Sequence, residues 1–556
     1  MQKNCLQCGQ SFEVTESDLA FYEKVSPEFG GKKYAVPSPS LCPDCRFQRR
    51  LMFRNDRYFY TRPSAKSGKE LITLYSPDKP YNVVSKEEWW EDDWDPRSFG
   101  RDVDFSRPFF EQFQELRLQV PRANLFQSKN ENSDYTNHAL NMRNCYLIWG
   151  GGENENCLYG NYVAFCKDTV DALCTYSCEW CYEGIASDRC YECIDFVNSR
   201  DCVDCIAIEE CSSCKHCIGC FGLHRKEYCL FNEELGKDAW ETHRKELGSL
   251  TSEKIALLRE RLHALRRSLP HRASHIFGSE DCTGDGIYNS RNCVSCFDIK
   301  DCDDCKFVAF TPKGISSQDC CFTAPVGPEL SYDMCSSLGL RLLFTFLAYH
   351  CDSTMYSMEC HECSDLFGCA SMRRNEYCIL NKQYAKEEYE KIAAKLVAHM
   401  QETGEWGEYF PPMLAPICYN ESNAQDYFPL TREQALAKGY QWYEGEETRS
   451  SGDLLFEIPA SIENVDEGIC DRVLACMATG KPFKIVPQEL RFYRKMGIPI
   501  PRYHPHERHR RRMLARTPRK LWSRSCAKCG KGIQTTYSPS RPEVVYCEEC
   551  YLKTVY

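Results

Sequence analysis

The centre of the chain alternates apolar and polar residues in short units, a pattern that predicts strands. Between residues 141 and 232 the units include RNCYLIWGG, DRCYECIDFVNS and HRKEYCLFN, with Asn, Asp and Gly at their junctions. Such segments, separated by turn residues, are typical of strands. Cysteine recurs every twelve residues at Cys178, Cys190 and Cys202, and every nine at Cys202, Cys211, Cys220 and Cys229. We therefore predict a parallel β-solenoid in which two or more units make one coil.

A second block repeats the first. At an offset of 149, CFGLHRKEYCLFN (220–232) aligns with CASMRRNEYCILN (369–381). Each block is followed by apolar residues at helical spacing, over about 236–268 and again over 384–400, which predicts helices that cap the blocks. A further helix is expected within 104–126, where Ser106 would cap it and an apolar stripe would pack on the solenoid end. That stripe consists of Phe109, Phe110, Phe113 and Leu116.

The N-terminus carries two CxxC pairs separated by a spacer long enough for a short helix. Thr15, with Asp18 three residues later, is a candidate N-cap for that helix. Four thiolates at this spacing suit a tetrahedral Zn²⁺ ion, because each pair offers two sulfurs from one tight turn. The predicted ligands are Cys5, Cys8, Cys42 and Cys45.

The two ends of the chain are duplicates, each a tandem of two ribbons. Residues 64–88 align without a gap with 526–550, and 476–496 aligns with the first N-terminal unit. Loss of ligands is reciprocal. The N-terminal tandem keeps its first cysteine set, whereas the C-terminal tandem keeps its second, which consists of Cys526, Cys529, Cys547 and Cys550.

In the units that lack cysteine pairs we expect the ribbon shape without metal. Residues 64–88 should keep their hairpins, with YSPDKP as a turn. Cys476, His504 and Glu507 stand at ligand positions in the other unit and leave open a residual site there, although Thr479 is a poor ligand. The alternative is a metal-free fold held by packing.

These motifs resemble known families. The CxxCG…CxxCR pattern of residues 5–46 is similar to small bacterial zinc-ribbon proteins. Over its whole length the chain looks like cysteine-rich proteins of uncultured bacteria with terminal zinc-ribbon modules. The features that carry this resemblance are the YSPx(K/R)P ribbons, GRDVDFSRPFFEQF and YFPLTREQALAKGYQW. The resemblance implies zinc ribbons and a bacterial cytosolic origin, but it brings no activity.

Cysteine usage bears on the compartment. The chain has 556 residues and 39 cysteines, of which 28 lie between 145 and 378. Because Met1 is not followed by an apolar segment, we expect a cytoplasmic protein whose cysteines are thiols or metal ligands. The central cysteines would either stack as small apolar groups inside the solenoid, which we favour, or form a row of metal sites. The first alternative implies about two zinc ions per chain.

Two basic arms follow the first ribbons, although the formal net charge is −11. Twelve Lys or Arg residues lie between Arg491 and Arg524 against one acid, and residues 46–62 hold six arginines among aromatics. Arginines beside aromatic residues suit phosphate contacts and base stacking, so we predict binding of nucleic acid or a nucleoprotein. The predicted contacts are Arg46, Arg49, Arg50, Arg54, Arg508, Arg510, Arg511, Arg512, Arg516, Arg519 and Lys520. The alternative is a solvated basic face, or arginines paired with acidic groups of the chain itself.

Two other function classes are a scaffold for protein partners and an enzyme. A solenoid with ribbons would also serve as a scaffold for protein partners. No P-loop, GxSxG, HExxH or dinucleotide motif is present, so we predict no catalytic residues and no small-molecule substrate. No apolar segment is long enough to span a bilayer, so a membrane role is not expected.

The predicted fold class is mixed and β-rich. A cysteine-rich, parallel β-solenoid-like, duplicated centre with helical caps is flanked by duplicated tandem zinc-ribbon modules. The expected segments are a ribbon tandem (1–97), a first block with its leading helix (98–235), a helix (236–275), a second block (276–382), a helix with a small connecting segment (383–465) and a ribbon tandem (466–556).

Overall fold

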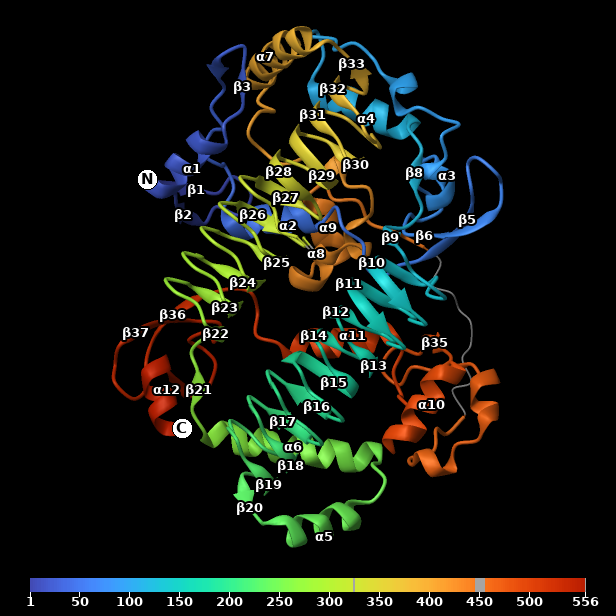
Figure 1. The fold of residues 1–556 in the computed structure, drawn as a ribbon, viewed down its shortest axis with the longest axis vertical. Coiled ribbons are helices and arrows are strands. Elements are labelled where there is room, and N and C mark those ends of the chain that lie inside the picture. The colour runs from blue at the N-terminus through green and yellow to red at the C-terminus, as the bar shows by residue number, and fades with distance from the viewer. Residues whose placement is uncertain (324–325, 446–455, 556) are drawn as a thin grey trace. The chain divides into compact units, whose positions relative to one another are not determined.

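The computed structural model describes residues 1–323, 326–445 and 456–555. The chain divides into two compact units (Figure 1). Unit 1 combines Met1–Phe126 with His275–Tyr443, and unit 2 combines Gln127–Ser274 with Glu444–Tyr556. Each unit therefore pairs one ribbon tandem with the cysteine-rich block from the other half of the sequence. This pairing by distant segments has no signal in the local sequence pattern.

Each unit is built on a twelve-stranded sheet in which nearly all pairs are parallel. In unit 2, Thr136 pairs with Ile148, Trp149 with Asn161, and Asn161 with Leu173, so successive partners are twelve residues apart. Figure 1 shows these strands as stacks of short arrows. Five strands of unit 2 also close a ring of parallel pairs in the order β11, β12, β14, β15 and β13.

The strands of the unit 2 sheet are β9 (Gln127–Ser128), β10 (Thr136–Arg143), β11 (Ile148–Glu155), β12 (Asn161–Ala164), β13 (Lys167–Val170), β14 (Leu173–Tyr176), β15 (Glu179–Asp188), β16 (Ile194–Val197), β17 (Ile206–Glu209), β18 (Lys215–Ile218), β19 (Glu227–Leu230) and β20 (Glu233–Glu234). Those of the unit 1 sheet are β22 (Ile276–Phe277), β23 (Gly284–Tyr288), β24 (Cys296–Lys300), β25 (Ala309–Pro312), β26 (Gln318–Cys321), β27 (Tyr332–Cys335), β28 (Leu338–Leu343), β29 (Phe346–Met355), β30 (Met358–His361), β31 (Ser364–Phe367), β32 (Glu376–Ile379) and β33 (Lys382–Gln383).

Left-handed backbone recurs at nearly every third residue of both sheets. From Asn141 to His216 almost every third φ lies near +50°, at many Asn and Asp positions but also at aromatic ones. Each such residue bends the chain, so the residue that follows it points inward. Asn and Asp tolerate this region better than other L-residues, which explains their place at the predicted unit junctions.

The three-residue step explains the cysteine pattern. Cys178 and Cys181 lie three residues apart, each directly after a left-handed residue (Ser177 and Trp180), and both are buried. From Cys202 to Cys229 cysteine recurs every nine residues, which is one twelve-residue repeat minus one three-residue step. The β-rich, cysteine-rich centre is thus confirmed, with a regular period of twelve in unit 2 in place of units of varying length.

All four ribbons keep the same knuckle turn. In each, the backbone N–H at the first ligand position donates to the carbonyl oxygen of the residue five positions later. A glycine with left-handed φ follows the second ligand position. These glycines are Gly9, Gly68, Gly480 and Gly530. The antiparallel hairpins around the turns are β1 (Gln2–Asn4) with β2 (Ser11–Glu13), β5 (Tyr60–Pro63) with β6 (Glu70–Thr73), β34 (Leu474–Ala475) with β35 (Pro482–Phe483), and β36 (Trp522–Ser525) with β37 (Gly532–Thr535).

Residues 64–88 keep the ribbon shape as predicted. Their hairpin is present, and the backbone N–H of Lys79 donates to Ser76 O in a turn within YSPDKP. Each second ribbon also pairs in parallel with a two-residue strand. β7 (Val83–Val84) pairs with β8 (Arg122–Ala123), and β38 (Val545–Tyr546) pairs with β21 (His271–Arg272). A small antiparallel pair, β3 (Glu28–Phe29) with β4 (Lys32–Lys33), lies within the first ribbon.

Most predicted helices are confirmed. The helices are α1 (Glu16–Val25), α2 (Pro43–Leu51), α3 (Lys86–Trp90), α4 (Phe109–Gln119), α5 (Lys237–Leu247), α6 (Ser252–Ser268), α7 (Lys386–Glu402), α8 (Asn423–Tyr427), α9 (Arg432–Ala437), α10 (Pro487–Met496), α11 (Pro505–Ala515) and α12 (Glu548–Val555). Thr15 and Asp18 form the expected capping box of α1. The helix expected over 236–268 is two helices, because Gly248 ends α5 with a left-handed φ.

Helix α4 packs as predicted but is capped differently. Phe109 and Phe113 are fully buried, and the Phe109 ring contacts Phe367 of the unit 1 sheet. Ser106 is not its N-cap, because that hydroxyl donates to Asp104 and the helix begins after Pro108. Its first two free N–H groups, those of Phe109 and Phe110, instead donate to the Glu405 carboxylate.

Candidate metal centres

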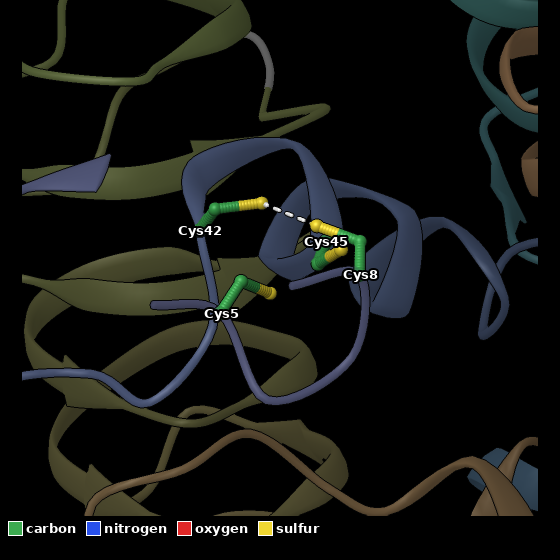
Figure 2. A group of neighbouring side chains, drawn as sticks. All are labelled: Cys5, Cys8, Cys42 and Cys45. Carbon is green, nitrogen blue, oxygen red and sulfur yellow. Dashed lines mark hydrogen bonds between the residues drawn. The ribbon is translucent and has the colours of Figure 1, made fainter. Parts of the chain in front are cut away.

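The first candidate metal centre joins the β1–β2 knuckle to the start of helix α2. Cys5 and Cys8 come from the knuckle, Cys42 is the residue before α2, and Cys45 lies in its first turn. All four sulfur atoms lie within 4.8 Å of one another. Figure 2 shows the four side chains turned toward a common centre.

The spacing of the sulfurs fits a tetrahedral zinc ion. Four sulfurs held about 2.3 Å from Zn²⁺ are about 3.8 Å apart by tetrahedral geometry. The Sγ atoms of Cys8 and Cys42 are 3.7 Å apart. The second predicted centre, at Cys526, Cys529, Cys547 and Cys550, has the same property, because Cys529 Sγ and Cys547 Sγ are also 3.7 Å apart. Both predicted cysteine sets are therefore brought together.

Hydrogen bonding prepares some of these thiols to ionise. A hydrogen bond from Cys45 lowers the pKa of Cys42 to about 5, and the same bond raises the pKa of Cys45. Burial would raise the pKa of Cys526, but backbone N–H groups including that of Cys547 lower it to about 6. The thiolate is the form of cysteine that ligates metal. The type and spacing of the four donors thus suit a structural Zn²⁺ ion, which would be held by thiolates alone.

The central cysteines have different surroundings. Within the part of the chain that the structure describes, only the two terminal sets have spacing suited to a metal ion. Central thiols such as Cys181 are buried and donate to backbone carbonyls, in this case Cys190 O at 3.4 Å. Cysteine here acts as a small apolar group with a weak donor. This favours the stacked-thiol interpretation over a row of metal sites.

In residues 64–88 a polar cluster occupies the ligand positions. Ser64 Oγ donates to Glu88 Oε2 at 2.6 Å, and the Ser85 N–H donates to the same carboxylate oxygen at 2.8 Å. Burial would raise the pKa of Glu88, but the bonds from Ser64, Ser67 and Ser85 hold it below the ordinary value of 4.5. Hydrogen bonds thus join the same two turns that sulfur ligands join in the intact copy.

The residual site considered at Cys476, His504 and Glu507 is not assembled among the described residues. Glu507 accepts hydrogen bonds from Arg510 and Arg511 instead. His504 Nδ1 accepts from the His506 N–H, and burial lowers the pKa of His504 to about 4. These groups are engaged within the chain.

The N-terminal basic arm is largely buried against the unit 1 sheet. Arg46 Nε donates to Asp319 Oδ2 at 3.0 Å, and Arg50 bridges Asp319 and Asp333 at 3.1 and 2.6 Å. Arg50 and Asp319 have no exposed surface. Arg54 is 3 % exposed and donates to Ser336 Oγ and Asp56. Arg49 is 17 % exposed and pairs with Glu408.

The C-terminal arm repeats this arrangement on the unit 2 sheet. Arg508 and Arg512 on α11 both bind the buried carboxylate of Asp171, Arg512 at 2.7 Å. Glu489 of α10 adds a second carboxylate, 3.4 Å from Arg508. Arg508 and Arg512 are buried, so the alternative of pairing within the chain holds for these arginines.

Other arm residues face outward. The side chains of Arg510 and Arg511 are 60 % and 48 % exposed, although both pair with Glu507. Arg516 is half-buried and donates to Cys174 Sγ. Arg519 is half-buried, whereas Lys520 is exposed and lies 5.8 Å from the Trp522 ring centre.

The carboxylates that bind the arginines of the two arms were not predicted from the sequence. Asp171 and Asp319 occupy left-handed bends of the two sheets and are 148 residues apart, close to the offset of the duplication. An aspartate repeated at nearly that offset was a signal available in the sequence. Its partners were not, because Arg46 and Asp319 are 273 residues apart.

Within the described residues no helix is both long and apolar enough to cross a membrane. A comparison of the chain with models of protein families and with curated proteins finds no match.

Proposed function

We propose that this protein is a non-enzymatic scaffold, in which zinc-stabilised ribbons are locked onto two parallel β-solenoids. The observation that carries the proposal is the duplicated docking of the arms. In both units the helix that begins at the second pair of ligand positions of the first ribbon, α2 or α11, buries two arginines on aspartates of the sheet. Side chains used in this way hold the molecule together and are withdrawn from any ligand.

The solenoid part of the proposal rests on the register. Partners twelve residues apart, with a bend at nearly every third residue, are what a four-sided coil of twelve residues requires. Inward positions at one coil spacing stack in columns, and Cys178, Cys190 and Cys202 form part of one. A repeat of this kind presents long regular faces suited to protein partners. We place the chain in a reducing compartment such as the cytosol, where its free thiols would persist.

Nucleic-acid binding is the second candidate, and the exposed side of α11 favours it. Arg510 and Arg511 point away from Asp171 and keep roughly half of their surface in solvent. Arginines of this kind contact phosphates in a sequence-independent, salt-sensitive way. The buried arginines Arg46, Arg50, Arg508 and Arg512 are not part of this candidate surface.

Metal analysis tests the zinc-stabilised scaffold. We expect about two zinc ions per chain, held at the two cysteine sets, and a lower melting temperature after chelation. Five or more zinc ions would place metal in the solenoids and contradict the stacked-thiol core. Absence of zinc from protein prepared with zinc present would reject the proposal.

A gel-shift assay with mixed-sequence RNA and DNA separates the two candidates. If the scaffold proposal holds, no shift is expected at physiological salt. A salt-sensitive shift that R510A/R511A abolishes would favour the nucleic-acid candidate. R189A is the control, because Arg189 is also exposed and ion-paired but lies in the bend directly after β15.

A further inference from the structure

Helix α2 carries both metal ligands and docking arginines. Its N-terminal end holds Cys42 and Cys45, while Arg46 and Arg50 lie one turn apart along the helix. Arg46 also donates to Leu41 O, next to the first of these cysteines, at 2.6 Å. One short, rigid element therefore connects the metal centre to the buried aspartates.

The two docking helices differ at their N-terminal ends. In α11 the preceding residue, His504, accepts a hydrogen bond from the His506 N–H, and Glu507 is held by two arginines. In α2 the equivalent residue, Cys42, makes no capping bond like that of His504, and its sulfur contacts other cysteines of the set, among them Cys8 Sγ at 3.7 Å. The metal-free helix is thus fixed by its own side chains, whereas the start of α2 is completed by the cysteine cluster.

Helix α2 needs such fixation. It has nine residues, and helices of this length are marginal in water without tertiary contacts. Its arginines must also be held in place, because a buried guanidinium that loses alignment with its carboxylate is strongly unfavourable. Anything that fixes the first turn of α2 therefore favours docking, and docking in turn preorganises Cys42 and Cys45.

We propose that zinc binding at Cys5, Cys8, Cys42 and Cys45 is coupled to docking of α2 on Asp319 and Asp333. This centre is then a zinc-dependent latch of unit 1, while α11 stays docked on Asp171 without metal. The inference rests on the proposed function, since it requires zinc at the first cysteine set. It goes further in assigning the two aspartates an effect on zinc affinity, although neither touches the metal centre.

Reciprocal linkage provides the test. If the two events are coupled, breaking the ion cluster must weaken zinc binding by the same factor that zinc strengthens docking. In the full chain, D319N should lower the zinc affinity of one of the two sites by about tenfold, which is within the usual range of coupling. Competition with a chelator measures this affinity. The other zinc ion is an internal control. D171N is the matched variant, because it removes the equivalent carboxylate under the metal-free helix, and it should leave both affinities unchanged.

Hydrogen exchange gives an independent measurement on the wild-type chain. Chelation should accelerate amide exchange over 43–51 at least tenfold, while 505–515 keeps its protection. This readout decides the question if D319N does not fold. The latch is overturned if the chain binds two zinc ions, D319N leaves both affinities unaltered, and 43–51 stays protected after chelation. The proposed function would remain intact in that case. A chain that binds no zinc would instead reject the proposed function.

Discussion

The second ribbons of the two tandems, 64–88 and 526–550, share a backbone arrangement and differ in the side chains at the four ligand positions. Both have the hairpin, the knuckle glycine and a parallel partner strand. The C-terminal copy gathers four thiols, whereas the N-terminal copy gathers hydroxyls and the Glu88 carboxylate. The ribbon backbone is therefore compatible with either set.

Packing accompanies the change of ligands. Leu74 and Tyr81 are buried in the N-terminal copy, in a cluster with Tyr75, Val83 and Ile417. At the same positions the C-terminal copy has Thr536 and Glu543. Burying a large apolar side chain contributes about 1.5–3 kcal/mol. A ribbon can therefore keep its fold without the cysteine set where its apolar side chains join a hydrophobic cluster with neighbouring segments.

The largest effect is expected from removing thiols of the intact copy. C526S/C529S should lose one zinc ion and open the β36–β37 hairpin, because metal binding in small zinc modules is worth on the order of 10 kcal/mol. Zinc content and hydrogen exchange over 522–535 measure both effects. S64A/S67A is the control and should not alter zinc content. Two zinc ions in the cysteine variant would contradict the assignment of this centre.

The next effect concerns the core that accompanies loss of metal. L74A should destabilise the N-terminal copy by about 2–5 kcal/mol, the usual cost of truncating a buried leucine. The equivalent T536A, which removes less apolar surface, should cost less than half as much. Exchange rates over 60–73 and 522–535 give the two values. Equal costs would show that packing does not distinguish the copies.

A smaller effect is expected at the polar cluster. E88Q removes the negative charge that accepts hydrogen bonds from the Ser64 hydroxyl and the Ser85 N–H. A hydrogen bond to a charged group contributes about 1.5–3 kcal/mol. Because Glu88 is half-buried, we expect about 1 kcal/mol, measured by urea unfolding. E87Q, at an exposed neighbour, is the matched control. An unchanged unfolding midpoint in E88Q would mean that the cluster does not replace the metal.

The smallest effect is a pH dependence. Burial would raise the pKa of Glu88, but hydrogen bonds from Ser64, Ser67 and Ser85 hold it below 4.5 in the folded protein. A depressed folded-state pKa stabilises the protein above the unfolded pKa, and that stability is lost as the pH falls through the folded value. The stability difference between wild type and E88Q should therefore shrink below pH 4.5. A difference that grows in acid would contradict the lowered pKa.

Local spacing made the cysteine sets, the duplications and most helices predictable. A CxxC pair needs only one tight turn, so the ligands of both centres could be assigned from the sequence. Thr15 with Asp18 likewise encodes a cap within four residues. The fate of the basic arms could not be predicted in the same way. Arg46 and Arg508 look like exposed cations until the aspartates that bury them, hundreds of residues away, are known.

Residue identity therefore accounts for the four knuckles, the two thiol clusters and the twelve-residue step of the unit 2 sheet, because turns and repeats depend on neighbours along the chain. Tertiary structure decides which tandem packs on which sheet and which arginines leave solvent. A guanidinium can be buried at low cost only where a carboxylate lies within hydrogen-bond distance of it. Only the folded chain brings Asp319 to α2 and Asp171 to α11.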